Sequence, residues 1–248
     1  FRGMQSNSYI TGYVLLGLVE ARDSGYDVSV SSIDRAVAYL EARLSDDVDY
    51  NTPDWQLNQQ VFMLYVLSKA HHDYNRYIDY LDALFEERVQ LSLTGRAYLL
   101  MAYELRNPDH PAVDALADDL LSHAIVSATG THWEDDAYDY RTWDSNTRSN
   151  AIILNALIQA RPGNPLLPGA VRWLVIARQG DRWESTQETV WSSMALSEWM
   201  TVSGDVNANY NYSIDLNGYT LLNGVMTNPT DSNQLTIDVS NFQPGDID

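Results

Sequence analysis

Two kinds of helical pattern alternate along this chain. Five stretches are apolar almost all round: 10–19, 61–67, 97–103, 151–157 and 190–200. A helix without a polar face has to be buried on every side. We therefore predict that these five stretches form inner helices.

The segments between them keep their apolar residues on one stripe. The first has Ile33, Val37, Leu40 and Leu44 on one face and charged residues on the other. Three more follow the same pattern: 77–84, 113–121 and 167–175. These amphipathic helices are expected to face water on one side.

Strict alternation of the two patterns predicts a mainly α fold built from helical hairpins in two layers. The economical arrangement of inner and outer helices is an α/α toroid over residues 1–203. Uneven spacing of the inner stretches argues against a short-period open solenoid. A chain of 248 residues with 45% hydrophobic content can bury such a core.

The hydrophobic period changes from helical to alternating near Gly204. Asn217-Gly218 is typical of a hairpin turn. The strand before it is expected to place Tyr210, Tyr212, Ile214 and Leu216 on one side, and a later strand Leu235, Ile237 and Val239. Residues 204–248 are thus predicted to be a partial β-sandwich segment, too short to fold alone.

One connection, 129–144, is acidic and aromatic and has no helical period. Its carboxylates could serve an enzyme as general acid and base, and its rings could stack on sugars. The residues concerned are Glu134, Asp135, Asp136, Asp139 and Asp144, with Trp133, Tyr138, Tyr140 and Trp143. We favour a solvated loop in which Asp144 or Ser145 caps the next helix.

Other candidate chemistry is weaker. Adjacent His71 and His72, followed by Asp73, lack the ligand spacing of a helical zinc site, and we place the histidines at a helix C-terminus. Ser185 and Glu188 fit a helical capping box, and no nucleophile elbow precedes Ser185 or Ser193. We predict no catalytic, cofactor-binding or metal-binding residue.

Two tryptophans close to this capping box allow two interpretations. Trp183 and Trp191 could contact neighbouring modules, where tryptophan is enriched. They could equally be large apolar residues that close one end of the helical layer.

The amino-acid composition argues against several classes of function. The chain has no cysteine, which excludes disulfides, thiolate metal sites and a cysteine nucleophile within these residues. A net charge of -19 argues against nucleic acid as a partner. No run reaches the ~18 consecutive apolar residues of a membrane span. From its ends we expect the sequence to be a piece of a longer protein.

A family resemblance is carried by the order and spacing of several segments. Asp144-Ser145-Asn146-Thr147-Arg148 leads into 151–157, then come Asn164-Pro165, 171–174 and 182–189. This succession resembles bacterial alpha-2-macroglobulin. Earlier, 9–22, Gly25-Tyr26 and 35–40 resemble the middle of that family's thioester-type helical domain. The likeness covers roughly residues 9 to 240.

The resemblance implies a helical toroid inserted into a β-sandwich module of an endopeptidase inhibitor. In that family a protease cuts a bait region, the molecule rearranges and the protease is trapped. Many members carry a thioester between Cys and Gln in a Cys-x-Glu-Gln motif. That motif is absent here, and Gln60, Gln187 and Gln243 have no cysteine to join.

The chain is accordingly expected to be a non-catalytic fragment without a cofactor. Its expected partners are neighbouring domains of the parent chain and, through the parent, target proteases, with no nucleic acid and no direct membrane insertion. The resemblance implies a cell-envelope location, periplasmic or extracellular. The alternative is an α/α-toroid glycosidase or polysaccharide lyase that uses the acidic residues of 129–144.

Overall fold

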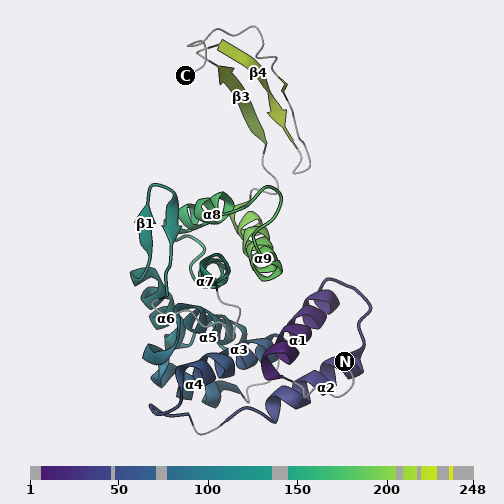
Figure 1. Ribbon diagram of the computed structural model, residues 1–248, viewed down its shortest axis with the longest axis vertical. Helices are drawn as coiled ribbons and strands as arrows, with labels where there is room; N and C mark the ends of the chain where they lie inside the picture. The colour runs from purple at the N-terminus through teal and green to yellow at the C-terminus, as the bar shows by residue number, and fades with distance from the viewer. Residues whose placement is uncertain are drawn as a thin grey trace. The chain divides into compact units, whose positions relative to one another are not determined.

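The chain divides into two compact units, residues 1–196 and 197–248. The computed structural model describes residues 7–45, 48–70, 77–135, 145–204, 209–216, 219–227 and 235–236. Helices make up most of the first unit, and a hairpin of two strands lies in the second (Figure 1).

The five apolar stretches all lie in helices. These are α1 (Ser8–Asp23), α3 (Asp54–Ala70), α5 (Leu93–Arg106), α7 (Asn146–Ala160) and α9 (Thr186–Ser203). Along the first unit, α1 contacts α3, α3 contacts α5, and α5 contacts α7. Several begin at a polar cap: the side chains of Asn7, Ser92 and Ser145 accept hydrogen bonds from first-turn amides of α1, α5 and α7.

The amphipathic stretches form the helices between them. These are α2 (Val30–Glu41), α4 (Ile78–Glu86), α6 (Pro111–Ser122) and α8 (Leu167–Ile176), and a short 3-10 helix, η2 (Arg88–Gln90), follows α4. Each of α2, α4 and α6 contacts the inner helix before it and the one after it. In α2 the buried residues are Ile33, Ala36, Val37 and Leu40, which confirms the predicted stripe.

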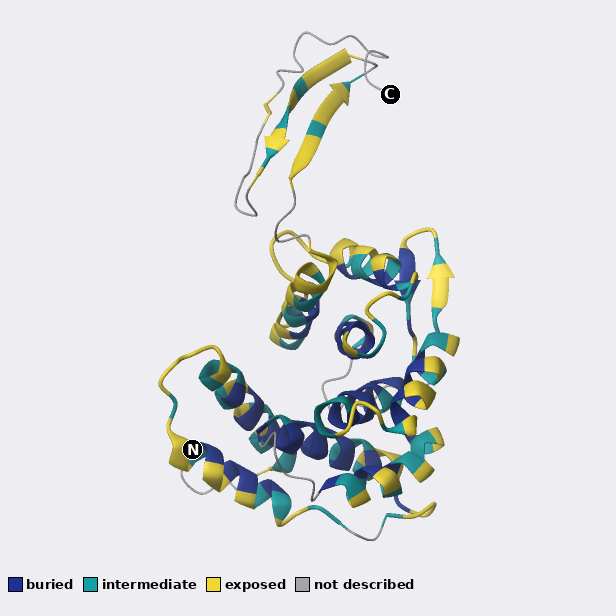
Figure 2. Ribbon diagram, turned by 180° about the vertical axis from the view of Figure 1, so that it is seen from behind, coloured by how far each residue is buried: buried dark blue, intermediate teal, exposed yellow. Residues whose placement is uncertain are grey.

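The centre of the inner layer is buried as predicted. All residues from Val61 to Leu67 in α3 are at most 2% exposed, and α5 and α7 are covered to a similar extent (Figure 2). The mainly α fold is confirmed, and so is its small C-terminal β segment. Closure of the inner layer into a ring, which a toroid requires, stays a prediction.

Burial on every side was wrong for two of the five helices. In α1, Ile10 is 51% exposed and Val14 is 55% exposed, and in α9 Val190 is 48% exposed. The reason for α1 lies in its neighbours, since the helices it contacts most are α2 and α3. The apolar face that carries Ile10 and Val14 is therefore exposed among the described residues.

A β-hairpin follows α6, where the sequence indicated only a loop. Strands β1 (Ile125–Ser127) and β2 (Gly130–His132) pair antiparallel, and β2 lies against α8. Gly130 has φ +138°, and a Cβ there would lie 2.3 Å from the carbonyl oxygen of Gly169. The backbones of β2 and α8 approach so closely that only glycine fits at this position.

Replacing Gly130 with alanine is expected to lower the free energy of unfolding by about 2–3 kcal/mol, since the backbone strain adds to the clash with Gly169. Urea denaturation followed by tryptophan fluorescence measures this loss. The matched control is Gly163→Ala, where a Cβ would meet nothing within 4 Å. Equal midpoints for the two variants would contradict the close packing of β2 on α8.

The second unit contains the predicted hairpin. β3 (Tyr210–Leu216) and β4 (Tyr219–Met226) pair antiparallel, with Leu216 opposite Tyr219. A register irregularity between Ile214 and Asp215 interrupts the predicted alternation. The turn residues Asn217 and Gly218 lie outside the described residues, as do Ile237 and Val239. The division into domains 1–203 and 204–248 stays a prediction.

Candidate functional site

Side chains from all five inner helices meet around one buried arginine. Arg148 of α7 is 1% exposed, and its Nη2 donates to the hydroxyl oxygens of Tyr9, Tyr13 and Tyr98 at 3.0, 2.8 and 3.1 Å. Aromatic rings of α3 and α9 surround these tyrosines. We call this group the Arg148 cluster; it consists of Tyr9, Tyr13, Phe62, Tyr65, Tyr98, Arg148 and Trp191.

Ring contacts join the helices of the cluster to one another. Phe62 lies 5.1 Å from the ring of Tyr9, 4.8 Å from that of Tyr13 and 5.1 Å from that of Tyr98. The ring of Tyr98 also contacts the ring of Trp191 edge-on, with 5.7 Å between the ring centres. Such tilted and edge-to-face pairs are the favoured arrangements of aromatic rings, so the cluster is packed as well as hydrogen-bonded.

Local sequence explains how the cluster is placed. Tyr9 and Tyr13 are four residues apart, so both point from the same face of α1. Arg148 lies in the first turn of α7, where its amide donates to the Oγ of Ser145 at 3.2 Å. Gly12 makes room for Phe62, because a Cβ there would lie 2.7 Å from the Cε1 atom of Phe62. The helix starts thereby bring the charged and phenolic groups to one place.

The arginine charge acts unequally on the tyrosines. Burial raises the pKa of Tyr13, but the charge of Arg148 and hydrogen bonds with Tyr9 and Arg148 outweigh it, and the pKa lies below its ordinary value. Burial dominates at Tyr98 and raises its pKa well above the ordinary value. Burial alone would lower the pKa of Arg148, yet the neighbouring tyrosines raise it. The guanidinium therefore stays protonated.

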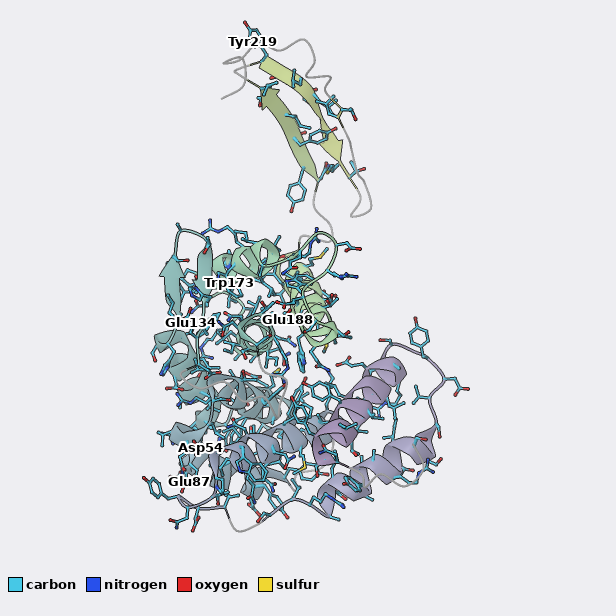
Figure 3. The ribbon with its side chains drawn as sticks, viewed as in Figure 1. Asp54, Glu87, Glu134, Trp173, Glu188 and Tyr219 are labelled. Carbon is cyan, nitrogen blue, oxygen red and sulfur yellow. The ribbon has the colours of Figure 1, made fainter. Side chains whose placement is uncertain are left out.

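A buried carboxylate beside the cluster joins the starts of α7 and α9. The capping box is confirmed: the amide of Glu188 donates to Ser185 Oγ at 3.1 Å, and the amide of Ser185 donates to Glu188 Oε2 at 3.1 Å. Glu188 is only 5% exposed, and its Oε1 also accepts from the Oγ of Ser145 at 2.6 Å (Figure 3). One side chain thus serves the N-caps of both inner helices.

The described part of the acidic loop, which ends at Asp135, is hydrogen-bonded to neighbouring helices. Trp133, expected as an exposed ring, is 1% exposed, and its Nε1 donates to the carbonyl of Leu120 at 2.7 Å. Asp135 accepts from the amide of Leu93, and Glu134 lies 3.3 Å from the Nε2 of His132 (Figure 3). The predicted solvated loop was therefore wrong for Trp133, because its ring fills the core, and this burial also removes it from the sugar-stacking alternative.

Part of that loop cannot be compared with the expectation. Asp136, Tyr138, Asp139, Tyr140, Trp143 and Asp144 lie outside the described residues. The expected cap on the next helix is confirmed for Ser145.

The remaining candidates that the structure describes do not form a common site. Trp183 and Trp191 are 5% and 0% exposed, and the Trp183 Nε1 donates to the carbonyl of Leu174, as a core role requires. His71, His72 and Asp73 lie outside the described residues, directly after α3 ends at Ala70. Within the described ranges, no group of three His, Asp or Glu side chains could hold a metal ion. Nor is any described helix long and apolar enough to span a bilayer.

Sequence reasoning did not find the Arg148 cluster. The signals available were weak: a Tyr-x-x-x-Tyr pair at the start of α1 and an arginine at the start of an apolar helix. In both patterns the side chains are equally compatible with a solvent-exposed position. Gln60 is another buried polar residue; its amide joins α3 to the segment after α2 through Arg43 and Ser45.

Comparison with known proteins gives one result for the sequence and another for the structure. The chain matches no protein-family model and no curated protein sequence. Solved structures do match. Salmonella alpha-2-macroglobulin reacted with methylamine has a TM-score of 0.66 at 18% identity, covering 91% of this chain and 14% of that one. This chain has the fold of a segment of bacterial alpha-2-macroglobulin.

Two structures from Escherichia coli agree. The native conformation of alpha-2-macroglobulin matches 92% of this chain and 14% of its own at a TM-score of 0.63 and 18% identity. A native alpha-2-macroglobulin piece from domain MG7 to the C-terminus has a TM-score of 0.60 at 18% identity, covering 92% of this chain and 34% of that piece. The resemblance stated from the sequence is confirmed at the level of the fold, and the chain spans about one seventh of the full relatives.

Proposed function

We propose that this chain is a non-catalytic part of an alpha-2-macroglobulin-like endopeptidase inhibitor. The observation that carries the proposal is the fold match over 91% of the chain, which extends beyond the helices of the first unit into the second. Two of the similar E. coli proteins are described as activated by trypsin or by porcine elastase. A protein of this kind responds to protease cleavage by rearranging.

In this proposal the inner helices act as a rigid body. The Arg148 cluster and Glu188 hold the starts of the inner helices together, which suits a domain that moves as a unit when the parent chain is cut. Its partners are neighbouring domains of the parent chain and, through the parent, target proteases. By the same resemblance the parent resides in the cell envelope, periplasmic or extracellular, and residues 1–203 are the toroid.

The test uses the full-length parent protein with trypsin or elastase. Trapped protease is expected to lose most of its activity on a large protein substrate while keeping activity on a small chromogenic peptide, since only the large substrate is sterically excluded. The control is the 248-residue chain alone, which is expected to leave both activities unchanged. Equal loss of both activities, or no loss with the parent, would contradict trapping.

The carbohydrate-active alternative is tested on the 248-residue chain itself. Incubation of the chain with polysaccharides is expected to release no product. Reproducible product that disappears in Glu134→Gln or Asp139→Asn would replace the inhibitor proposal with an enzyme that uses the 129–144 loop.

A further inference from the structure

The three phenols bound by Arg148 differ in their access to solvent. Tyr9 and Tyr98 are 6% and 3% exposed, whereas Tyr13 is only half-buried. The hydrogen bond from Arg148 to Tyr13 is also the shortest of the three, at 2.8 Å. A reactive tyrosine needs a cation near its oxygen and some exposure to solvent, and Tyr13 has both.

Hydrogen-bond geometry favours a negative charge on one of the phenols. The Nη2 atom of an arginine carries two hydrogens, and here three phenol oxygens of the described residues lie within 3.1 Å of it. Two of these oxygens, those of Tyr9 and Tyr13, are also within 3.4 Å of each other. Ionisation of one phenol turns its contact with the arginine cation into an ion pair, and the lone pairs of its oxygen then accept from its neighbour.

The shortest bond to Arg148 and the partial exposure to solvent favour Tyr13 as the phenol that ionises first. From its own helix it meets Tyr9, from α3 Phe62 and from α5 Tyr98. From α7 it meets the cation of Arg148, and the indole of Trp191 lies close by on α9. The lowered pKa of Tyr13 and the raised pKa of Tyr98 agree with this order.

We propose that Tyr13 is a nucleophilic tyrosine whose phenolate is stabilised by Arg148 and reacts with activated acyl donors. In the reaction the phenol proton leaves to solvent and the phenolate oxygen attacks the acyl carbon. An aryl ester C–O bond forms, the bond between the acyl carbon and the leaving group breaks, and the leaving group takes up a proton from water. Arg148 is a positioning residue in this step, since it binds the oxygen and not the donor.

The experiment treats the whole chain with N-acetylimidazole over a range of pH and follows O-acetylation of each tyrosine by peptide mass mapping. The acetylation rate of Tyr13 is expected to reach half its plateau at a lower pH than that of Tyr50, an exposed reference phenol that is 75% exposed. Comparing pH profiles rather than rates removes the effect of unequal access. In Arg148→Lys, circular dichroism checks the fold and the Tyr13 profile is expected to move toward that of Tyr50.

A second measurement does not depend on reagent access. Absorbance at 295 nm is expected to reveal an early ionisation step that amounts to one of the 16 tyrosines, at a pH below the ordinary range near 10. The step should vanish in Tyr13→Phe and persist in Tyr50→Phe. Identical pH profiles for Tyr13 and Tyr50, an early step that survives Tyr13→Phe, or no acetylation of Tyr13 would each overturn the proposal.

Discussion

Replacement of Arg148 by methionine is expected to lower the free energy of unfolding by about 3–5 kcal/mol. The substitution keeps an unbranched apolar chain but removes the donor shared by three tyrosine oxygens. Two of these phenols, Tyr9 and Tyr98, are buried, and each hydroxyl left without its donor costs about 1–3 kcal/mol. Tyr13 is only half-buried, so it adds less to the loss.

Urea denaturation of the chain, followed by circular dichroism, measures this change. The matched control is Arg172→Met on α8, where the arginine is exposed and the expected change stays within about 0.5 kcal/mol. If Arg148→Met unfolds at the same urea concentration as the control, the cluster does not hold the inner helices together. Arg148→Lys should lie between the two, since an ammonium can reach some of the oxygens but lacks the planar fork.

The second large effect is expected at Trp191. Replacing it with alanine should lower the free energy of unfolding by about 3–5 kcal/mol, because the ring is 0% exposed and its removal leaves a cavity. The edge-on contact of this ring with Tyr98, at 5.7 Å, is lost as well. Since Trp191 attaches α9 to the cluster, the loss should concentrate in that helix.

Thermal unfolding and amide hydrogen exchange together measure the Trp191→Ala effect. Exchange is expected to rise most in α9 and least in α3. Trp55→Ala is the control, because that indole is 43% exposed and contributes little to the core. An unchanged melting temperature for Trp191→Ala would mean that α9 is not part of the inner layer.

The helical periodicity predicted most of the fold correctly. It succeeded at α3, α5 and α7 because burial of an all-apolar segment is favourable and neighbouring helices cover these three. Ser185 with Glu188 and Ser145 before α7 were equally predictable, since a cap depends on neighbouring residues alone. The hairpin of β3 and β4 followed from alternation around Asn217-Gly218.

The errors arose where burial depends on a distant part of the chain. The sequence of α1 is that of an inner helix, but Ile10 and Val14 are exposed among the described residues, because α1 contacts mainly α2 and α3. Trp133 lies in an acidic stretch and was assigned to a loop surface, yet its indole bonds to α6 and its backbone to Asn150 of α7. β1 and β2 are three residues each, too short for alternation to reveal them.

The sequence alone determined which helices are apolar all round, which are amphipathic and where many of them begin, because these properties depend on residues within one or two turns. Tertiary structure alone decided that Arg148 would meet Tyr9, Tyr13 and Tyr98, residues that are 139, 135 and 50 positions away. A charge can be buried only if partners surround it, and no local pattern records which distant helices will supply them.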